Sequence, residues 1–326
     1  MKDFIPEIIG QEKAKKALKV LFENASVTKR LPPIGLIASK GSGKSMIAKA
    51  IARNICKTDG TGPRKFIRIN AAAYTSMDSF IDGVILPFMN GQEVTLFIDE
   101  ASELSKKVTM ALLTILEDSD DGFAEYQYPG GVLNFDFHKQ TFIFGTSEPQ
   151  KVFHALMSRF KKIELAQYTR DELKEVVIGR LSLLNKFSYD DDAMDDILGV
   201  VRTNPRDARK LADEIRDNML FRKVTNLNGA VWKKIKSSLG VYPLGLTETE
   251  IRVLQYLKDR TLVPGGAEGT SLTQLASSLD MTRECVQRDA EKLLLAKNFL
   301  AIGIKGRKVT KFGLEYLESL AKNTIV

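Results

Sequence analysis

A single stretch, GLIASKGSGKSMIAKAIA from Gly35 to Ala52, restricts the possible folds of this chain more than any other. It has the spacing of the phosphate-binding loop G-x-x-x-x-G-K-[ST], with Ala38 in place of the first glycine. A short apolar run precedes the glycines and a helical apolar pattern follows them, so the stretch predicts a strand, a loop and a helix. We expect an alanine at position 38 to be tolerated if its φ is negative, because only a positive φ requires glycine.

The residues of this loop predict a site for ATP and Mg²⁺. Backbone N–H groups and the helix N-terminus would surround the phosphates, Lys44 would reach the β and γ oxygens, and the Ser45 hydroxyl would hold the metal. Since so relaxed a pattern arises by chance in about two chains per hundred of this length, a second motif is needed. The other nucleotide contacts predicted from the loop are Gly41, Ser42, Gly43 and Met46.

The second motif lies in EVTLFIDEAS, where residues 94–98 read as a buried strand that ends in Asp99 and Glu100. Parallel strands deliver their carboxyl ends to the edge where the phosphate loop lies. Asp99 is therefore predicted as a metal ligand, and Glu100 as the base that orients and deprotonates the attacking water. A third apolar run ends in two hydroxyls, and either Ser147 or Thr146 could contact the γ-phosphate or that water.

The last part of the chain, residues 241–326, predicts a winged helix. GLTETEIRVLQYLKDR opens with a capping box, and two further helical segments follow in helix-turn-helix order with a turn at 279–281. Two short β-rich arms around KGR and a last helix complete the pattern. Such a domain places its second helix in the DNA major groove and its wing on the backbone, although the fold also serves protein contacts. The predicted DNA contacts are Arg283, Gln287 and Arg288 on the helix and Lys305, Arg307 and Lys308 on the wing.

The composition is that of a globular protein with a basic excess. The net charge is +7 and the sequence pI is about 9.1, which favours a polyanionic partner such as nucleic acid. Hydrophobic residues make up 44% and charged residues 27% of the chain, as in ordinary soluble domains. No apolar run approaches the roughly 18 residues of a membrane span, and charges stand where a signal peptide would be apolar. We therefore expect no membrane segment and a cytoplasmic location.

Together these motifs resemble those of the AAA+ ATPases, and their order resembles the branch that contains RuvB and the clamp loaders. PEIIGQEKAKKAL is similar to the segment that packs around adenine, which implies that Ile8 and Ile9 form a wall of the base site. LMSRF is similar to the arginine-finger segment, which implies that Arg159 meets the γ-phosphate held by a neighbouring subunit. YTRDEL and TNPRDARKLADEIRD resemble the segments that bring Tyr168 near adenine and point Arg206 at the nucleotide.

The resemblance implies an α/β fold in three parts: a parallel-sheet P-loop AAA+ core over 1–166, an all-α lid over 167–240 and the winged helix over 241–326. A finger that acts in trans implies a homo-oligomer, and the family implies a hexamer. In RuvB a long hairpin docks the junction-binding partner RuvA. Here residues 123–138 predict a shorter hairpin with exposed or half-exposed aromatic side chains, a candidate site for a RuvA-like or other protein partner. Those side chains are Tyr126, Tyr128, Phe135 and Phe137.

The function that the resemblance implies is an ATP-hydrolysing motor on double-stranded or branched DNA, with RuvB-like junction migration or translocation. An alternative from another class is an ATP-dependent assembly switch, such as a clamp loader, a helicase loader or an origin-binding initiator. A DNA-binding transcription regulator ranks last, because no activator-type loop is recognisable. Stimulation of hydrolysis by bare duplex DNA would favour the motor, and dependence on a clamp or helicase would favour the switch.

Overall fold

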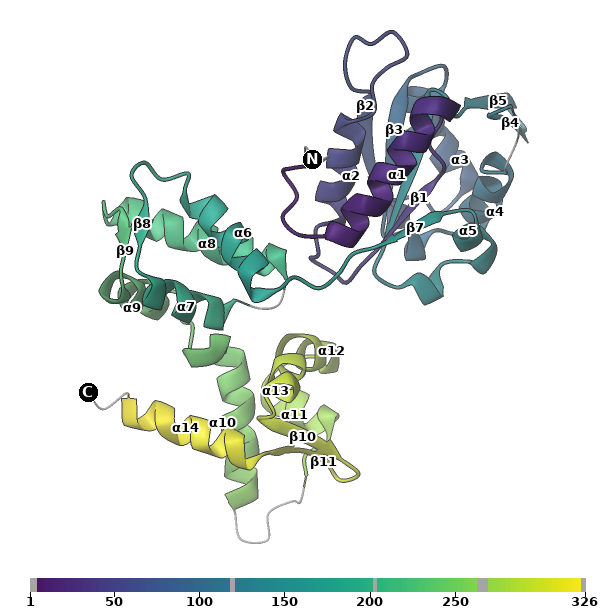
Figure 1. The fold of residues 1–326 in the computed structure, drawn as a ribbon. Coiled ribbons are helices and arrows are strands. Elements are labelled where there is room, and N and C mark those ends of the chain that lie inside the picture. Colours follow the sequence, from purple (N-terminus) through teal and green to yellow (C-terminus); the bar gives the residue numbers. More distant parts are fainter. Residues whose placement is uncertain (1–4, 118–120, 202–203, 263–268, 324–326) are drawn as a thin grey trace. The chain divides into compact units, whose positions relative to one another are not determined.

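The computed structural model describes residues 5–117, 121–201, 204–262 and 269–323. The chain divides into two compact units, Met1–Arg180 with Thr203–Asp213 and Leu181–Arg202 with Glu214–Val326. Figure 1 shows the elements of both units along the chain. The division into segments 1–166, 167–240 and 241–326 stays a prediction.

The first unit is built on a five-stranded parallel sheet with the order β2-β3-β6-β1-β7. The central strands β3 and β6 are buried along their whole length, as expected for a parallel sheet that helices cover on both faces. The register aligns Ile37 with Thr146 and Asn70 with Asp99, so the carboxyl ends of the strands lie at one edge. The strands are β1 Ile34–Ile37, β2 Lys65–Asn70, β3 Val94–Asp99, β6 Gln140–Thr146 and β7 Lys161–Glu164.

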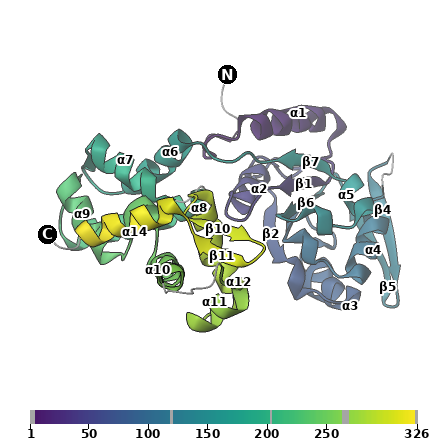
Figure 2. The ribbon, with the colours of Figure 1, turned by 90° about the horizontal axis from the view of Figure 1, so that it is seen from below.

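A hydrophobic core lies on each face of this sheet. Each strand contributes to both cores, because its successive side chains point to opposite faces. Phe97 packs with α1 and α2 on one face, whereas its neighbours Leu96 and Ile98 pack with α3, α4 and α5 on the other. Figure 2 shows the sheet with α1 on one side and α3 and α4 on the other. The helices are α1 Glu12–Thr28, α2 Lys44–Arg53, α3 Met77–Phe80, the wider helix Ile81–Met89, α4 Lys106–Ile115 and α5 His154–Ser158.

A β-hairpin extends from the first unit between α4 and β6. Its strands are β4 Phe123–Tyr128 and β5 Gly131–Asp136, paired from Phe123 with Asp136 to Tyr128 with Gly131. Pro129 and Gly130 form the two-residue turn, so the hairpin predicted from the Pro-Gly-Gly sequence is confirmed.

The second unit begins with short helices and a small parallel pair of strands, β8 Ser188–Tyr189 and β9 Asn226–Leu227. The lid was predicted to be all-α, so this strand pair is a small correction. Two-residue strands have no periodicity that sequence analysis could detect. The helices here are α7 Asp191–Val200 and α9 Gly229–Ser238, while α6 Arg170–Leu181 and α8 Pro205–Phe221 each begin in the first unit and end in the second.

The C-terminal part of the second unit has the predicted winged-helix order. Buried side chains of α10, the helix-turn-helix segment, the wing strands and α14 form its core. The second helix of the helix-turn-helix widens to π geometry over Val286–Glu291, which was not predicted. The elements are α10 Glu248–Leu262, α11 Leu272–Ser278, α12 Arg283–Cys285, α13 Lys292–Ala296, β10 Leu300–Gly303, β11 Gly306–Val309 and α14 Lys311–Asn323. In the described ranges, no helix has the length and apolar character to cross a bilayer.

Candidate nucleotide site and nucleic-acid interface

The phosphate loop connects the end of β1 to the start of α2. Gly41 and Gly43 have φ values of 85° and 91°, which only glycine adopts without strain. Ala38 lies outside this left-handed region, and its N–H donates to the carbonyl of Thr146 over 3.2 Å. The condition for tolerating alanine at this position is therefore met.

Lys44 lies at the centre of the loop. Its Nζ donates to the carbonyl oxygens of Ala38 at 2.9 Å and Ser39 at 3.3 Å. Burial lowers the pKa of the Lys44 ammonium, and the nearby carboxylates of Glu100 and Asp99 oppose that shift. A cation held this way, with two carboxylates beside it, is well placed to bind phosphate oxygens.

The acidic pair lies at the end of β3, where the sheet register delivers it to the loop. Ser45 Oγ donates to Asp99 Oδ2 over 3.2 Å, so the two predicted metal ligands lie together. Arg68 on β2 donates to the same oxygen over 2.7 Å. Glu100 has a φ of 54°, and its N–H donates to Asp99 Oδ1 over 3.1 Å. A left-handed glutamate is a strained conformation of the kind found at functional sites.

One cavity of about 490 Å³ collects most of the predicted nucleotide-site residues. The predicted residues that do not line it are Ile8, Arg159 and both candidate hydroxyl residues, Thr146 and Ser147. The predicted residues that do line it are Ile9, Gly41, Ser42, Gly43, Lys44, Ser45, Met46, Asp99, Glu100, Tyr168 and Arg206. Their individual roles stay predictions.

The end of the cavity predicted to hold adenine is organised by the N-terminal segment. Ile9 is half-buried and lines the cavity, whereas Ile8 is buried in the core beneath. Gln11 fastens this segment to Ala166, since its side chain donates to the carbonyl over 2.9 Å and accepts from the N–H over 2.8 Å. Burial raises the pKa of the Tyr168 phenol, which also lines the cavity.

The start of α8 meets the phosphate loop. Asn204 caps this helix, since its Oδ1 accepts from the N–H of Asp207 over 2.9 Å, and Pro205 occupies the first turn as its ring favours. A Cβ on Gly41 would lie 2.8 Å from the Asn204 side-chain oxygen, which explains the glycine there. Arg206 is exposed and lines the cavity. Cavity residues that sequence reasoning missed include the charged side chains Glu7, Lys40, Arg68, Arg180 and Arg209.

The two hydroxyls after β6 differ in their partners. Thr146 Oγ1 accepts from the N–H of Glu148 over 3.0 Å, which closes a local turn. Ser147 Oγ is buried and has no hydrogen-bond partner among the described residues. Gly145 brings this strand end close to Asp99, because a Cβ there would lie 3.3 Å from Asp99 Oδ1. Of the two candidates, Ser147 therefore has the hydroxyl that could accept a new partner.

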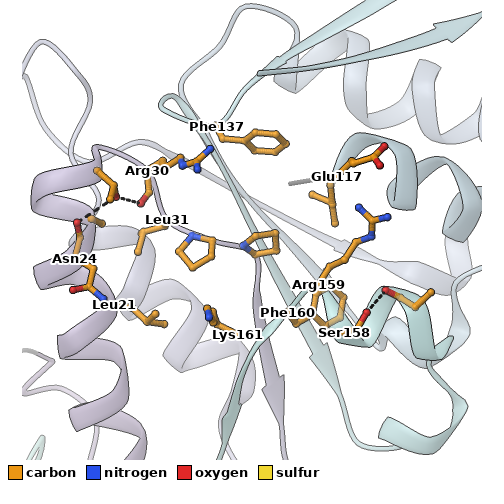
Figure 3. Close-up of a pocket in the computed structure, with 16 residues that line it drawn as sticks. Leu21, Asn24, Arg30, Leu31, Glu117, Phe137, Ser158, Arg159, Phe160 and Lys161 are labelled. Atoms are coloured by element: carbon orange, nitrogen blue, oxygen red, sulfur yellow. Dashed lines mark hydrogen bonds between the residues drawn. The ribbon is translucent and has the colours of Figure 1, made fainter. Parts of the chain in front are cut away.

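Arg159 lies in a different pocket, of about 750 Å³. Figure 3 shows it projecting from the end of α5 into this pocket, which α1, the Pro32-Pro33 turn and the start of β7 complete. No residue lines both this pocket and the cavity around Lys44. A role for Arg159 at a nucleotide held by another subunit is compatible with this separation and stays a prediction.

The predicted DNA-contacting helix presents its polar face outward. Arg283, Gln287 and Arg288 are exposed. Arg288 donates to both carboxylate oxygens of its neighbour Asp289, at 2.7 and 2.8 Å. An exposed ion pair of this kind is weak enough to exchange for a phosphate.

The wing divides its three predicted DNA contacts into two groups. Lys305 and Lys308 are exposed. Arg307, however, turns its guanidinium inward onto the buried carboxylate of Glu291, with Nε to Oε1 at 2.5 Å and the second contact at 3.4 Å. Its prediction as a phosphate contact is therefore corrected. The cause is Glu291, 16 residues earlier, whose burial at 4% exposure requires a cationic partner.

The hairpin also needs one correction. Phe135 is 1% exposed and belongs to the core of the first unit, because it lies on the inward face of β5 with Leu133. Tyr126, Tyr128 and Phe137 are half-buried as predicted. The exposed apolar side chains of the hairpin are instead Phe123 and Val132.

Comparison with known families agrees with this arrangement of sites. The model described as ATPase family associated with various cellular activities (AAA) matches residues 34–168. The model described as RuvB C-terminal winged helix domain matches residues 243–318. Both parts of the predicted resemblance are therefore confirmed, together with the α/β fold class.

Individual relatives are similar over nearly the whole chain. The RuvB subunit of the Holliday junction branch migration complex of Mycoplasmopsis pulmonis is 25% identical over 317 residues, covering 96% of both chains. Its counterpart from Thermotoga maritima is 27% identical, covering 96% of this chain and 90% of that one. The solved structure of the Thermotoga maritima RuvB Holliday junction branch migration motor has a TM-score of 0.70 at 26% identity, covering 97% and 99% of the two chains.

Proposed function

We propose that this chain, an AAA+ ATPase that resembles RuvB over nearly its whole length, is an ATP-hydrolysing oligomeric motor that acts on double-stranded or branched DNA in the cytoplasm. The main support for the proposal is that one chain contains both a cavity lined by the phosphate loop and the acidic end of β3, and a winged helix of the RuvB type. The named relatives are subunits of a Holliday junction branch migration complex, and migration of such junctions is the specific activity proposed.

The cavity residues fit ATP and Mg²⁺. The loop between Gly41 and Gly43 would donate backbone N–H groups to the phosphates, and the Lys44 ammonium would leave its carbonyl partners to bind the β and γ oxygens. Ser45 and Asp99, already joined at 3.2 Å, would hold the metal between them. When bound, Mg²⁺ would neutralise charge that builds on the phosphates during transfer.

Two further residues would act on the water that attacks the γ-phosphate. Glu100 lines the cavity directly after the metal ligand, so its carboxylate would orient the water and take its proton. Ser147 Oγ, with no partner among the described residues, would accept or donate a hydrogen bond near the γ-phosphate. Arg206, on the first turn of α8, would bind the phosphates as a further cation of the cavity.

The proposal includes a homo-oligomer, with six subunits in a ring as the specific form. Arg159 supports it, because it lines a pocket that shares no residue with the cavity around Lys44, as expected of a finger arginine that acts on the γ-phosphate of a neighbouring subunit. The hairpin at 123–138 is the proposed site for a protein partner of the RuvA kind, since it presents Phe123 and Val132 to solvent.

The test is ATP hydrolysis by the full chain, with no DNA, with linear duplex and with four-way-junction DNA. We expect strong stimulation by DNA, and its loss in Lys44→Ala, Glu100→Gln and Arg159→Ala. Loss of the finger arginine should reduce hydrolysis by about 10³-fold or more. Lys161→Ala, which removes an exposed cation from the pocket of Arg159, is the matched control and should retain most of the activity.

Mixing subunits tests the trans arrangement. Lys44→Ala and Arg159→Ala chains should each be inactive alone, but a mixed ring would contain interfaces with an intact Lys44 on one side and an intact Arg159 on the other. We expect the mixture to recover part of the activity. Hydrolysis that DNA does not stimulate, but that a clamp or a helicase does, would favour an assembly switch over a motor.

A further inference from the structure

The wing of the C-terminal domain carries an apolar side chain at its tip. Strands β10 and β11 pair up to Gly303 with Gly306, so Ile304 and Lys305 form the two-residue turn. Two-residue hairpin turns ordinarily use glycine, asparagine or aspartate. Ile304 is instead fully exposed, at 108% of its reference area, and Ile302 on the same strand is 49% exposed. Isoleucine at this position gains nothing from the fold, so its side chain is available for a contact outside the domain.

The base of the wing is held firmly. Thr270 and Arg307 exchange two backbone hydrogen bonds of 2.8 Å, which add a third strand segment beside the hairpin. A Cβ on Gly306 would clash with the carbonyl oxygen of Thr270, so the two backbones are in close contact. The ion pair of Arg307 with buried Glu291 ties the same strand to the helix that precedes it. The backbone that leads to Ile304 is therefore anchored before binding, which lowers the ordering entropy that the hairpin has to lose.

The charge around this tip favours a nucleic acid as its partner. Residues 292–311 contain no acidic residue and six basic residues, of which Arg307 is paired with Glu291 and the other five are lysines. Lys305 follows Ile304 directly, Lys308 is exposed on β11, and the exposed Arg283 lies at the start of the second helix. An apolar protein surface would match Ile304 but not this surrounding charge. DNA offers both phosphates for the cations and an apolar base stack for the isoleucine.

We propose that Ile304 is a wedge that enters a base step of the bound DNA, while Lys305 and Lys308 hold the phosphates on either side. This inference rests on the proposed function, because it assumes that the winged helix binds DNA. An inserted apolar side chain partly unstacks the step that it enters. The cost is lowest where stacking is already weak, such as a mismatch or a branch point, so the wing would favour distorted DNA over perfect duplex.

The experiment uses the full chain and two short duplexes that differ by one central mismatch, each with 2-aminopurine beside the centre. Affinity is measured by fluorescence anisotropy at a fixed salt concentration, and unstacking by the rise in 2-aminopurine fluorescence. The variants are Ile304→Thr, which keeps the branch at Cβ but replaces the ethyl arm with a hydroxyl, Ile304→Leu, which stays apolar, and Lys305→Ala.

We expect wild type to bind the mismatched duplex more tightly and to raise its 2-aminopurine fluorescence. Ile304→Thr should lose the fluorescence rise and about tenfold of the affinity for the mismatched duplex, a loss comparable with that of one stacked base. Ile304→Leu should keep both. Lys305→Ala should weaken binding to both duplexes alike and reduce the slope of log affinity against log salt by about one.

Three outcomes would overturn the wedge. If wild type and Ile304→Thr gave equal fluorescence and affinity, the wedge would be refuted. The proposed motor function would not be affected, because DNA binding would persist. A change of oligomer size in Ile304→Thr, measured by light scattering, with unchanged DNA signals would make the tip a protein contact. Absence of DNA binding by wild type would refute both the wedge and the proposed function. The first two outcomes would refute the wedge alone, so the two kinds of failure can be distinguished.

Discussion

Removal of Arg307 should destabilise the second unit rather than merely weaken DNA binding. The side chains of Arg307 and Glu291 are 14% and 5% exposed, and their closest approach is 2.5 Å. Arg307→Ala would leave a buried carboxylate without its cation, which typically costs about 3–5 kcal/mol. With a urea m-value of about 2 kcal/mol/M, the unfolding midpoint should fall by roughly 1.5–2.5 M.

The chain offers its own probe for this measurement. Trp232 is the single tryptophan, and it lies in α9 of the same compact unit as the wing. Its fluorescence during urea unfolding should report the shift. Arg307→Met combined with Glu291→Leu should restore most of the loss, since an apolar pair of similar volume removes both charges. An unchanged midpoint in Arg307→Ala, with reduced affinity for DNA, would refute this reasoning and return Arg307 to the phosphate contacts.

Three further predictions concern the nucleotide site. Ala38→Gly should change the Kd for ATP by less than about threefold in calorimetry, because position 38 does not need a positive φ; a tenfold gain in affinity would contradict this. Arg68→Ala should lower the Mg²⁺ concentration that half-saturates hydrolysis by about tenfold, since it removes a charge-assisted hydrogen bond to Asp99 that competes with the metal; a higher Mg²⁺ requirement would refute the competition. Gln11→Ala should destabilise the first unit by about 2 kcal/mol in thermal unfolding, because it leaves the N–H and carbonyl of Ala166 without their partners; an unchanged melting temperature would mean that water replaces them.

The sequence predicts the centre of the parallel sheet but not its edges. Strands β1, β3 and β6 are the three central strands, and their continuous apolar runs identify them. Strands β2 and β7 lie at the two edges and mix charged with apolar residues, as in KFIRIN and KKIE. Short runs that contain lysine and arginine resemble exposed loops, and they occur here because an edge strand buries only part of its surface.

In the site, features that depend on neighbouring residues of the chain are predictable from the sequence, and features that depend on distant residues are not. Spacing along the chain predicts the phosphate loop and the acidic pair, since each functions through consecutive residues. Arg68 and Gln11 remained unnoticed because their partners, Asp99 and Ala166, are 31 and 155 residues away. For the same reason the sequence could not distinguish Arg307 from the exposed lysines beside it. From the sequence alone, a basic residue in a wing is predicted to contact phosphate. Only the structure shows that a buried carboxylate, Glu291, is the partner of Arg307.

Chain continuity offers a physical route from the nucleotide cavity toward the rest of the chain. Tyr168 directly precedes the capping box that begins α6, where the Thr169 N–H donates to Glu172 over 2.7 Å, and Arg206 lies on the first turn of α8. Helix α8 continues from the first unit to Phe221 without a break, whereas α6 ends at Leu181, at the boundary. A helix transmits displacement at one end to the other, because its hydrogen bonds resist bending. If Arg206 binds phosphate as proposed, a change of its phosphate contacts would move α8 as a whole, which the proposed motor would require of this helix.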